Sequence, residues 1–180
     1  PPVRPVQPPG ITEVAFGSPG WDVSEGEDRY RRSIYTFIKR TAPFAMVTTF
    51  DGPTGEACIA RRNRSNTPLQ ALTLLNDPMF VDLARVSGDY VLQRSDISDD
   101  QRIVDLFRRL LTRTPDATEM AALKGFVVQH RKMFRDHPEQ AIELTGKKVA
   151  NGDGKAVAEL ATWTALSRAV FALDEVVMRP

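Results

Sequence analysis

The chain has 180 residues, 42% of them hydrophobic, and its 24 Lys and Arg residues nearly balance 23 Asp and Glu residues, which gives a net charge of +1. A chain of this length buries roughly 70% of its unfolded surface and needs no disulfide or metal to fold. The small net charge creates no field that attracts nucleic acid or anionic lipid. No apolar run approaches the ~18 residues of a membrane helix. We therefore expect a soluble domain that binds no nucleic acid and has no membrane span.

Cysteine and histidine are scarce in the chain. Cys58 is the single cysteine, which excludes an internal disulfide and a haem attached through two cysteines of this chain. The two histidines, His130 and His137, are too few for a histidine-based metal cage. We therefore predict no metal ion and no cofactor. Because the chain starts at Pro1 and has no hydrophobic signal segment, we interpret it as part of a longer polypeptide.

Prolines and glycines dominate the first twenty residues. Proline removes a backbone donor and fixes φ, so residues 1–23 are predicted to form an extended proline-rich arm. Apolar residues then recur at helical spacing within residues 27–40 and predict a first helix with one buried face: Tyr30, Ile34, Phe37 and Ile38. Residues 44–50 favour an extended run, which the turn Asp51-Gly52-Pro53 closes.

Helix-start signals follow in the middle of the chain. Thr67-Pro68-Leu69-Gln70 and Ser98-Asp99-Asp100-Gln101 both have the pattern of a capping box, in which two side chains satisfy each other's backbone amides. Asp77 before Pro78 is predicted to be the N-cap of a helix that runs to about Gln93. Gly88 within that helix either weakens it by about 1 kcal/mol relative to alanine or permits close packing there.

The last part of the chain contains further helix signals. Thr114-Pro115 and Pro138 each start a helix, and residues 155–173 predict a final helix that is apolar on most faces. Such a helix is usually central in a bundle. The patterns together predict an all-α fold, an irregular helical bundle of about six helices, in which residues 24–180 form a single domain.

Several runs of the sequence are distinctive. They are Gly26–Phe37, Phe50-Asp51, Cys58, Arg61-Arg62, Arg64–Leu72, Leu75–Pro78, Phe107–Pro115 and Leu173–Glu175. Together they resemble the planctomycete PSD-type domain of unknown function, and the chain resembles the C-terminal part of that larger domain. The resemblance implies a place in large exported proteins, which often carry cytochrome-c-like segments and sometimes carbohydrate-binding modules. It supplies no catalytic residues, so we predict none.

The strongest candidate for a binding site lies within Ala57–Asn76, a segment without acidic residues. The candidate residues are Arg61, Arg62, Asn63, Arg64 and Asn66. Guanidinium groups and the amides of a helix start both suit a carboxylate, sulfate or phosphate group. Two interpretations stay open. The arginines bind an acidic ligand or a partner's acidic patch, or they fix the loop by internal ion pairs with Asp51, Glu56 or Asp77.

Three further residues are secondary candidates. Positive neighbours favour the thiolate of Cys58, as in a nucleophile, but such a thiol needs a nearby base. The alternative, which we favour, is a buried apolar role for Cys58. Asp51 and Asp77 are candidates for the carboxylate pair of a glycoside hydrolase, although N-capping already accounts for Asp77.

The distinctive residues are mostly explained by capping and packing. We therefore predict a non-catalytic structural or interaction module of an exported multidomain protein, which packs against upstream regions of its own polypeptide and docks a cytochrome-c-like module. The alternative is part of an enzyme that acts on acidic or sulfated polysaccharide. In that case the arginine segment binds the anion and an Asp/Glu pair supplies acid–base catalysis.

Overall fold

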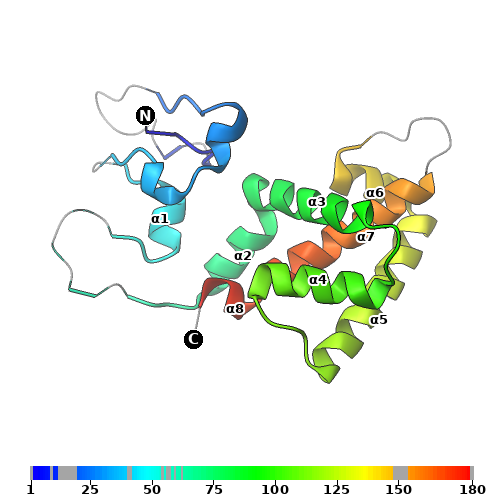
Figure 1. Ribbon diagram of the computed structural model, residues 1–180. Helices are drawn as coiled ribbons and strands as arrows, with labels where there is room; N and C mark the ends of the chain where they lie inside the picture. Colours follow the sequence, from blue (N-terminus) through cyan, green and yellow to red (C-terminus); the bar gives the residue numbers. More distant parts are fainter. Residues whose placement is uncertain are drawn as a thin grey trace. The chain divides into compact units, whose positions relative to one another are not determined.

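The computed structural model (Figure 1) describes residues 2–8, 10–11, 20–39, 42–53, 55, 58, 60–61, 63–147 and 154–178. Contacts divide the chain into two units, residues 1–70 and residues 71–180. The predicted division into an arm, residues 1–23, and one helical domain, residues 24–180, stays a prediction.

The described residues are mainly helical, and their only strand-like pairing is a single bridge between Val3 and Thr36. Six of the α-helices have seven or more residues, which confirms the predicted all-α bundle of about six helices. The elements are η1 Gly26–Tyr30, η2 Ser33–Tyr35, α1 Ala45–Thr49, α2 Pro68–Asn76, α3 Pro78–Gln93, α4 Asp99–Leu111, α5 Ala117–Asp136, α6 Pro138–Thr145, α7 Gly154–Phe171 and α8 Asp174–Val177, where η marks a 3₁₀ turn.

Helix α7 is the centre of residues 71–180. Its buried side chains belong to all three groups of core residues in this unit, among them Trp163, Ala161 and Val170. It contacts α3, α4, α5 and α6, and Figure 1 shows it as the orange helix among them. A helix with neighbours on every side buries apolar residues on every face. The prediction of a central final helix is therefore confirmed.

Helices α3 and α7 approach each other closely at Gly88. A Cβ atom at this position would lie 3.0 Å from both the backbone N and the Oγ1 of Thr164. Gly88 and Thr164 are both buried, so the Thr164 side chain cannot turn into solvent to make room for a Cβ atom. Of the two roles that the sequence allows for Gly88, the structure supports close packing.

An ion-pair network joins α4, α5 and α7. Arg131 on α5 lies 2.7 Å from Asp99 Oδ2 on α4 and 2.8 Å from Glu159 Oε1 on α7. The Arg131 side chain is only 18% exposed, so both pairs are partly shielded from water. The hydrogen bond from Arg131 is the largest cause that lowers the pKa of the Asp99 carboxyl below its usual value.

Cap hydrogen bonds confirm most of the predicted helix starts. Backbone N of Gln70 donates to Thr67 Oγ1 (3.3 Å) and that of Thr67 to Gln70 Oε1 (3.1 Å), so this capping box is formed. The box at Ser98 is formed in the same way, and Asp77 Oδ1 accepts from Met79 N at 2.9 Å. These bonds satisfy amides that a helix start leaves without intrahelical partners.

Two helix boundaries near the end of the chain differ from the prediction. The N-cap of α5 is Asp116 rather than Thr114, because the Asp116 carboxylate accepts from Glu119 N at 2.8 Å and completes a capping box with Glu119. Helix α7 ends at Phe171, and α8 follows as a short helix that the sequence patterns do not predict.

The predicted helix over residues 27–40 is wrong. The segment contains the 3₁₀ turns η1 and η2, and the bridge residue Thr36 that follows them is extended. Val3 N donates to Tyr35 O, and Phe37 N donates to Val3 O, both at 2.8 Å. These backbone groups pair with the N-terminal arm instead of with an α-helix.

The predicted extended run over residues 44–50 is also wrong, because α1 forms there. The hydroxyl groups of Thr48 and Thr49 both donate to Ala45 O, at 2.8 and 2.9 Å. Such bonds to the preceding turn let threonine occupy a helix despite its β-branched side chain. The β-propensity of this stretch was therefore outweighed by local hydrogen bonding.

Candidate functional site

Three polar side chains fasten the two ends of the loop that carries the candidate arginines. Asp51 Oδ2 accepts from both the N and the Oγ of Ser65, at 2.7 Å each. Gln70 is only 1% exposed, and its Nε2 donates to Thr49 O at 2.9 Å and to Ser65 Oγ at 3.1 Å. We call Asp51, Ser65 and Gln70 the polar clasp. It closes the loop 52–64 at its base.

Local backbone chemistry places the clasp residues. Asp51 follows α1 with φ 55°, in the left-handed region that aspartate tolerates better than most residues. The capping box of α2 holds the Gln70 side chain against Thr67, so its amide nitrogen points to Thr49 and Ser65. The distinctive runs Phe50-Asp51 and Arg64–Leu72 thus contribute the residues that close the loop.

The candidate residues Arg61, Asn63, Arg64 and Asn66 are all exposed, whereas Arg62 lies outside the described residues. Within the described part of the chain, neither Arg61 nor Arg64 has an ion-pair partner. Of the internal partners considered above, Asp51 accepts from Ser65 and Asp77 caps α3, and Glu56 lies outside the described residues. Ligand binding and internal pairing of these arginines both stay predictions.

Cys58 is exposed, so the interpretation of it as a buried apolar residue is wrong. It lies in the loop that the polar clasp closes, outside the regular helices that form the core. Loops carry fewer apolar neighbours than packed helices, which explains the exposure. The two histidines that would be needed as a base belong to residues 71–180, a different unit.

The proposed carboxylate pair, Asp51 and Asp77, is divided between the two units. Burial is the largest influence on the Asp77 carboxyl and raises its pKa, while the amides of Met79 and Phe80 act in the opposite direction. Both carboxylates accept hydrogen bonds that shape the backbone. Their pairing for catalysis stays a prediction.

Arg113, from the distinctive run Phe107–Pro115, forms two ion pairs, each with two hydrogen bonds. Its Nη1 and Nη2 donate to the Glu119 carboxylate at 2.8 and 2.7 Å, and its Nε and Nη2 donate to the Glu175 carboxylate at 2.7 and 2.6 Å. The guanidinium lowers the pKa of Glu119 to about 2 and also lowers that of Glu175. Arg113 therefore ties the start of α5 to α8.

The sequence patterns missed two other arginines, Arg85 on α3 and Arg168 on α7. Arg85 Nε donates to Leu144 O on α6 at 2.8 Å, and Arg168 donates to Leu75 O on α2 from Nη2 (2.6 Å) and from Nε (3.1 Å). Both acceptors lie in the last turn of a helix, where carbonyl groups lack intrahelical partners. The bonds span 59 and 93 residues, so no local signal predicts them.

The described residues contain no group of three or more His, Cys, Asp or Glu side chains with the arrangement of a metal site. In the same part of the chain, no helix has both the length and the hydropathy of a membrane-crossing segment.

Comparison with known proteins places the chain in a family. Residues 1–127 match the PSD1 family, whose description is a protein of unknown function (DUF1553). No curated protein and no solved structure matches the chain. The family match ends within α5, so the run Leu173–Glu175 lies beyond it. Because the match covers more than half of the sequence, the chain belongs to the PSD1 family.

Proposed function

We propose that the chain is a non-catalytic interaction module of a larger exported protein. In this proposal, residues 30–38 are its contact surface for upstream regions of the same polypeptide. The observation that carries the proposal is the exposure of large apolar side chains in this stretch. Ile34 is 85% exposed and Ile38 is 69% exposed, and about half of Tyr30 and Tyr35 is exposed. Concentrated exposed apolar residues are typical of a protein interaction site.

The exposed stretch is held in a defined conformation by its backbone. The arm residue Val3, which is buried, is hydrogen-bonded on both sides, to Tyr35 and to Phe37. The Arg4 guanidinium lies over the Phe37 ring, 4.7 Å from its centroid. A surface that is fixed before binding loses less conformational entropy when a partner docks.

Arginine side chains lie over two of the aromatic rings of this surface. Arg29 lies over the Tyr30 ring at 5.7 Å, and Arg31 lies over the Tyr35 ring at 5.8 Å. Arg31 also pairs with Asp28 at 2.7 Å. Tyrosine and arginine are enriched among the residues that dominate binding energy at protein interfaces. The composition of the stretch therefore supports a protein partner.

Site-specific photo-crosslinking in the full-length polypeptide tests this function. A photoreactive amino acid at Ile34 is expected to crosslink to upstream regions, including a cytochrome-c-like segment where one is present. Val128 on α5 is 67% exposed and is the matched control position, which should give few crosslinks. Crosslinks at Ile34 no more frequent than at Val128, or only to a second copy, would contradict the proposal. Fractionation of the same cells tests export, because the proposal requires the protein outside the cytoplasm.

The exposure of Arg61 and Arg64 supports a second candidate function, part of an enzyme that acts on acidic or sulfated polysaccharide. Here the closed loop 52–64 would present guanidinium groups to the sugar anions. The variant with Arg61→Gln and Arg64→Gln should then stay folded and bind a sulfated polysaccharide at least about tenfold more weakly, as is expected when charge-assisted hydrogen bonds are lost. Arg108→Gln, at an exposed arginine of α4, is the control. Unchanged binding in the double variant would remove this candidate.

A further inference from the structure

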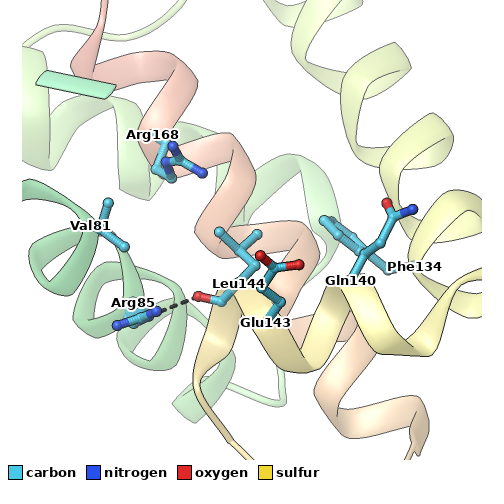
Figure 2. Close-up of a pocket in the computed structure, with 7 residues that line it drawn as sticks. All are labelled: Val81, Arg85, Phe134, Gln140, Glu143, Leu144 and Arg168. Carbon is cyan, nitrogen blue, oxygen red and sulfur yellow. Dashed lines mark hydrogen bonds between the residues drawn. The ribbon is translucent and has the colours of Figure 1, made fainter. Parts of the chain in front are cut away.

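A pocket of about 590 Å³ lies within residues 71–180, between α3, α6, α7 and the end of α5. Figure 2 shows its lining, with Arg85 and Val81 on α3, Arg168 on α7, and Gln140, Glu143 and Leu144 on α6. Phe134 completes the wall. The volume is in the range of pockets that hold small organic ligands. None of these residues belongs to the arginine loop or to the exposed stretch 30–38.

The positive charge of Arg168 is not balanced by a carboxylate in the described part of the structure. Its Nε and Nη2 both donate to Leu75 O, which fixes the guanidinium plane without neutralising its charge. Arg85 is different, because its Nη1 pairs with Asp82 Oδ1 at 2.9 Å and its Nε donates to Leu144 O. A guanidinium has more N–H groups than these bonds use, and the remaining ones suit a carboxylate.

The α6 side of the pocket supplies hydrogen-bond acceptors, in contrast to the donors of Arg85 and Arg168. Glu143 and Gln140 are exposed, and their carboxylate and amide oxygens can accept hydrogen bonds from hydroxyl or amine groups. The negative charge of Glu143 also disfavours a compact dianion such as sulfate. Val81, Leu144 and Phe134 supply the apolar part of the lining.

We propose that this pocket binds a small organic carboxylate that carries hydroxyl groups. The carboxylate pairs with Arg168, with Arg85 as a second donor, and the hydroxyl groups donate to Glu143 and Gln140. The carbon skeleton lies against the apolar residues of the pocket. This site is independent of the contact surface proposed above, so either one can fail without the other.

Calorimetric titration of the full chain with gluconate tests the pocket. Gluconate has a carboxylate and several hydroxyl groups, and sorbitol is its uncharged counterpart. We expect saturable binding of gluconate and at least about tenfold weaker binding of sorbitol and of sulfate, because only gluconate satisfies both walls. Equal binding of gluconate and sorbitol, or stronger binding of sulfate, overturns the proposal. So does the absence of gluconate binding at millimolar concentration.

Variants locate the binding. Arg168→Lys keeps the charge but loses the planar fork, and it should weaken gluconate binding about tenfold or more. Arg109→Lys is the control, since Arg109 stacks on Tyr90 at 4.0 Å and does not line the pocket. Arg168 also donates to Leu75 O on α2, so its substitution could disturb the fold. The Glu143→Gln variant tests the pocket without changing that contact. It should bind sulfate several-fold more tightly, as expected when a like charge is removed. Unchanged sulfate binding in the Glu143→Gln variant would contradict the proposal that Glu143 lines the binding site.

Discussion

Residues 71–180 bury three groups of apolar side chains, each of which includes residues of α7, whereas residues 1–70 bury few apolar side chains and are joined largely by hydrogen bonds. In the first unit, the buried apolar residues among the described positions are Val3, Pro5, Ala42 and Phe44. Its segments are joined by backbone pairing to the arm and by the polar clasp. Hydrophobic spacing forms an amphipathic helix only where a core is present to receive the apolar face.

The largest loss of stability is expected for a substitution at Trp163, in the apolar core of residues 71–180. The ring is 0% exposed and belongs to the core group with Ile103, Leu106 and Leu166. Trp163→Ala should lower the free energy of unfolding by about 3–5 kcal/mol, since it leaves a cavity that the surrounding helices cannot fill. Urea denaturation followed by helical circular dichroism measures this change.

Two controls make the result specific. Trp163→Phe should cost much less, because it keeps an aromatic ring and removes an indole N–H that finds no acceptor among the described residues. Phe44→Ala, in the first unit, should open residues 1–70 to proteolysis while the unfolding transition of α7 changes little. If Phe44→Ala instead lowers the same transition as much as Trp163→Ala, residues 24–180 unfold as the single domain that the sequence predicts.

The contrast explains which elements the sequence predicts correctly. The starts at Thr67, Asp77 and Ser98 depend on residues within one turn of each other, and all three are confirmed. The helix expected over residues 27–40 failed because its backbone pairs with Val3, a residue far away in the sequence. Spacing of apolar residues cannot reveal such a competitor.

The second prediction concerns the contact between α3 and α7. Gly88→Ala raises intrinsic helix propensity, yet its Cβ would lie 3.0 Å from the Thr164 backbone in the middle of α7. We expect a net loss of about 1–3 kcal/mol, because the packed backbone has to move. Gly125→Ala is the matched control, since nothing lies within 4 Å of its added Cβ. It should stabilise α5 by up to about 1 kcal/mol. A stabilised Gly88→Ala variant would show that α3 and α7 are not closely packed there.

The third prediction concerns the polar clasp. Gln70→Ala removes both hydrogen bonds that Nε2 donates, to Thr49 O and to Ser65 Oγ, and the acceptor of the Thr67 amide. We expect a cost of about 1–2 kcal/mol, which is localised to residues 1–70. Hydrogen exchange should show faster exchange in α1 and in the loop 52–64. Gln101→Ala, at the exposed capping box of α4, should leave the exchange of these segments unchanged.

The candidate site is predictable only in part, for a similar reason. The sequence singled out the arginines of the loop by the composition of one short stretch, and it singled out Asp51 as a turn residue and candidate carboxylate, but not as the acceptor of hydrogen bonds from Ser65. It did not identify Arg85 and Arg168, whose acceptors Leu144 and Leu75 are brought close by the packing of α6 and α2. A pocket between helices depends on crossing geometry, which local residue patterns do not encode.

The smallest expected effect is the pH dependence that Arg113 creates. Its ion pairs lower the pKa of Glu119 from 4.5 to about 2, so Glu119 contributes stability that is present above its unfolded pKa. That contribution is lost as the pH falls from about 4.5 towards 2, and Glu175 acts in the same direction. Arg113→Met should therefore flatten the dependence of stability on pH in this range, whereas Arg109→Met should not. The effect stays small because the Arg113 side chain is 40% exposed and water screens the pairs. An unchanged acid profile in Arg113→Met would mean that α8 is held by its apolar contact through Val176 to Phe107 and Leu111 rather than by charge.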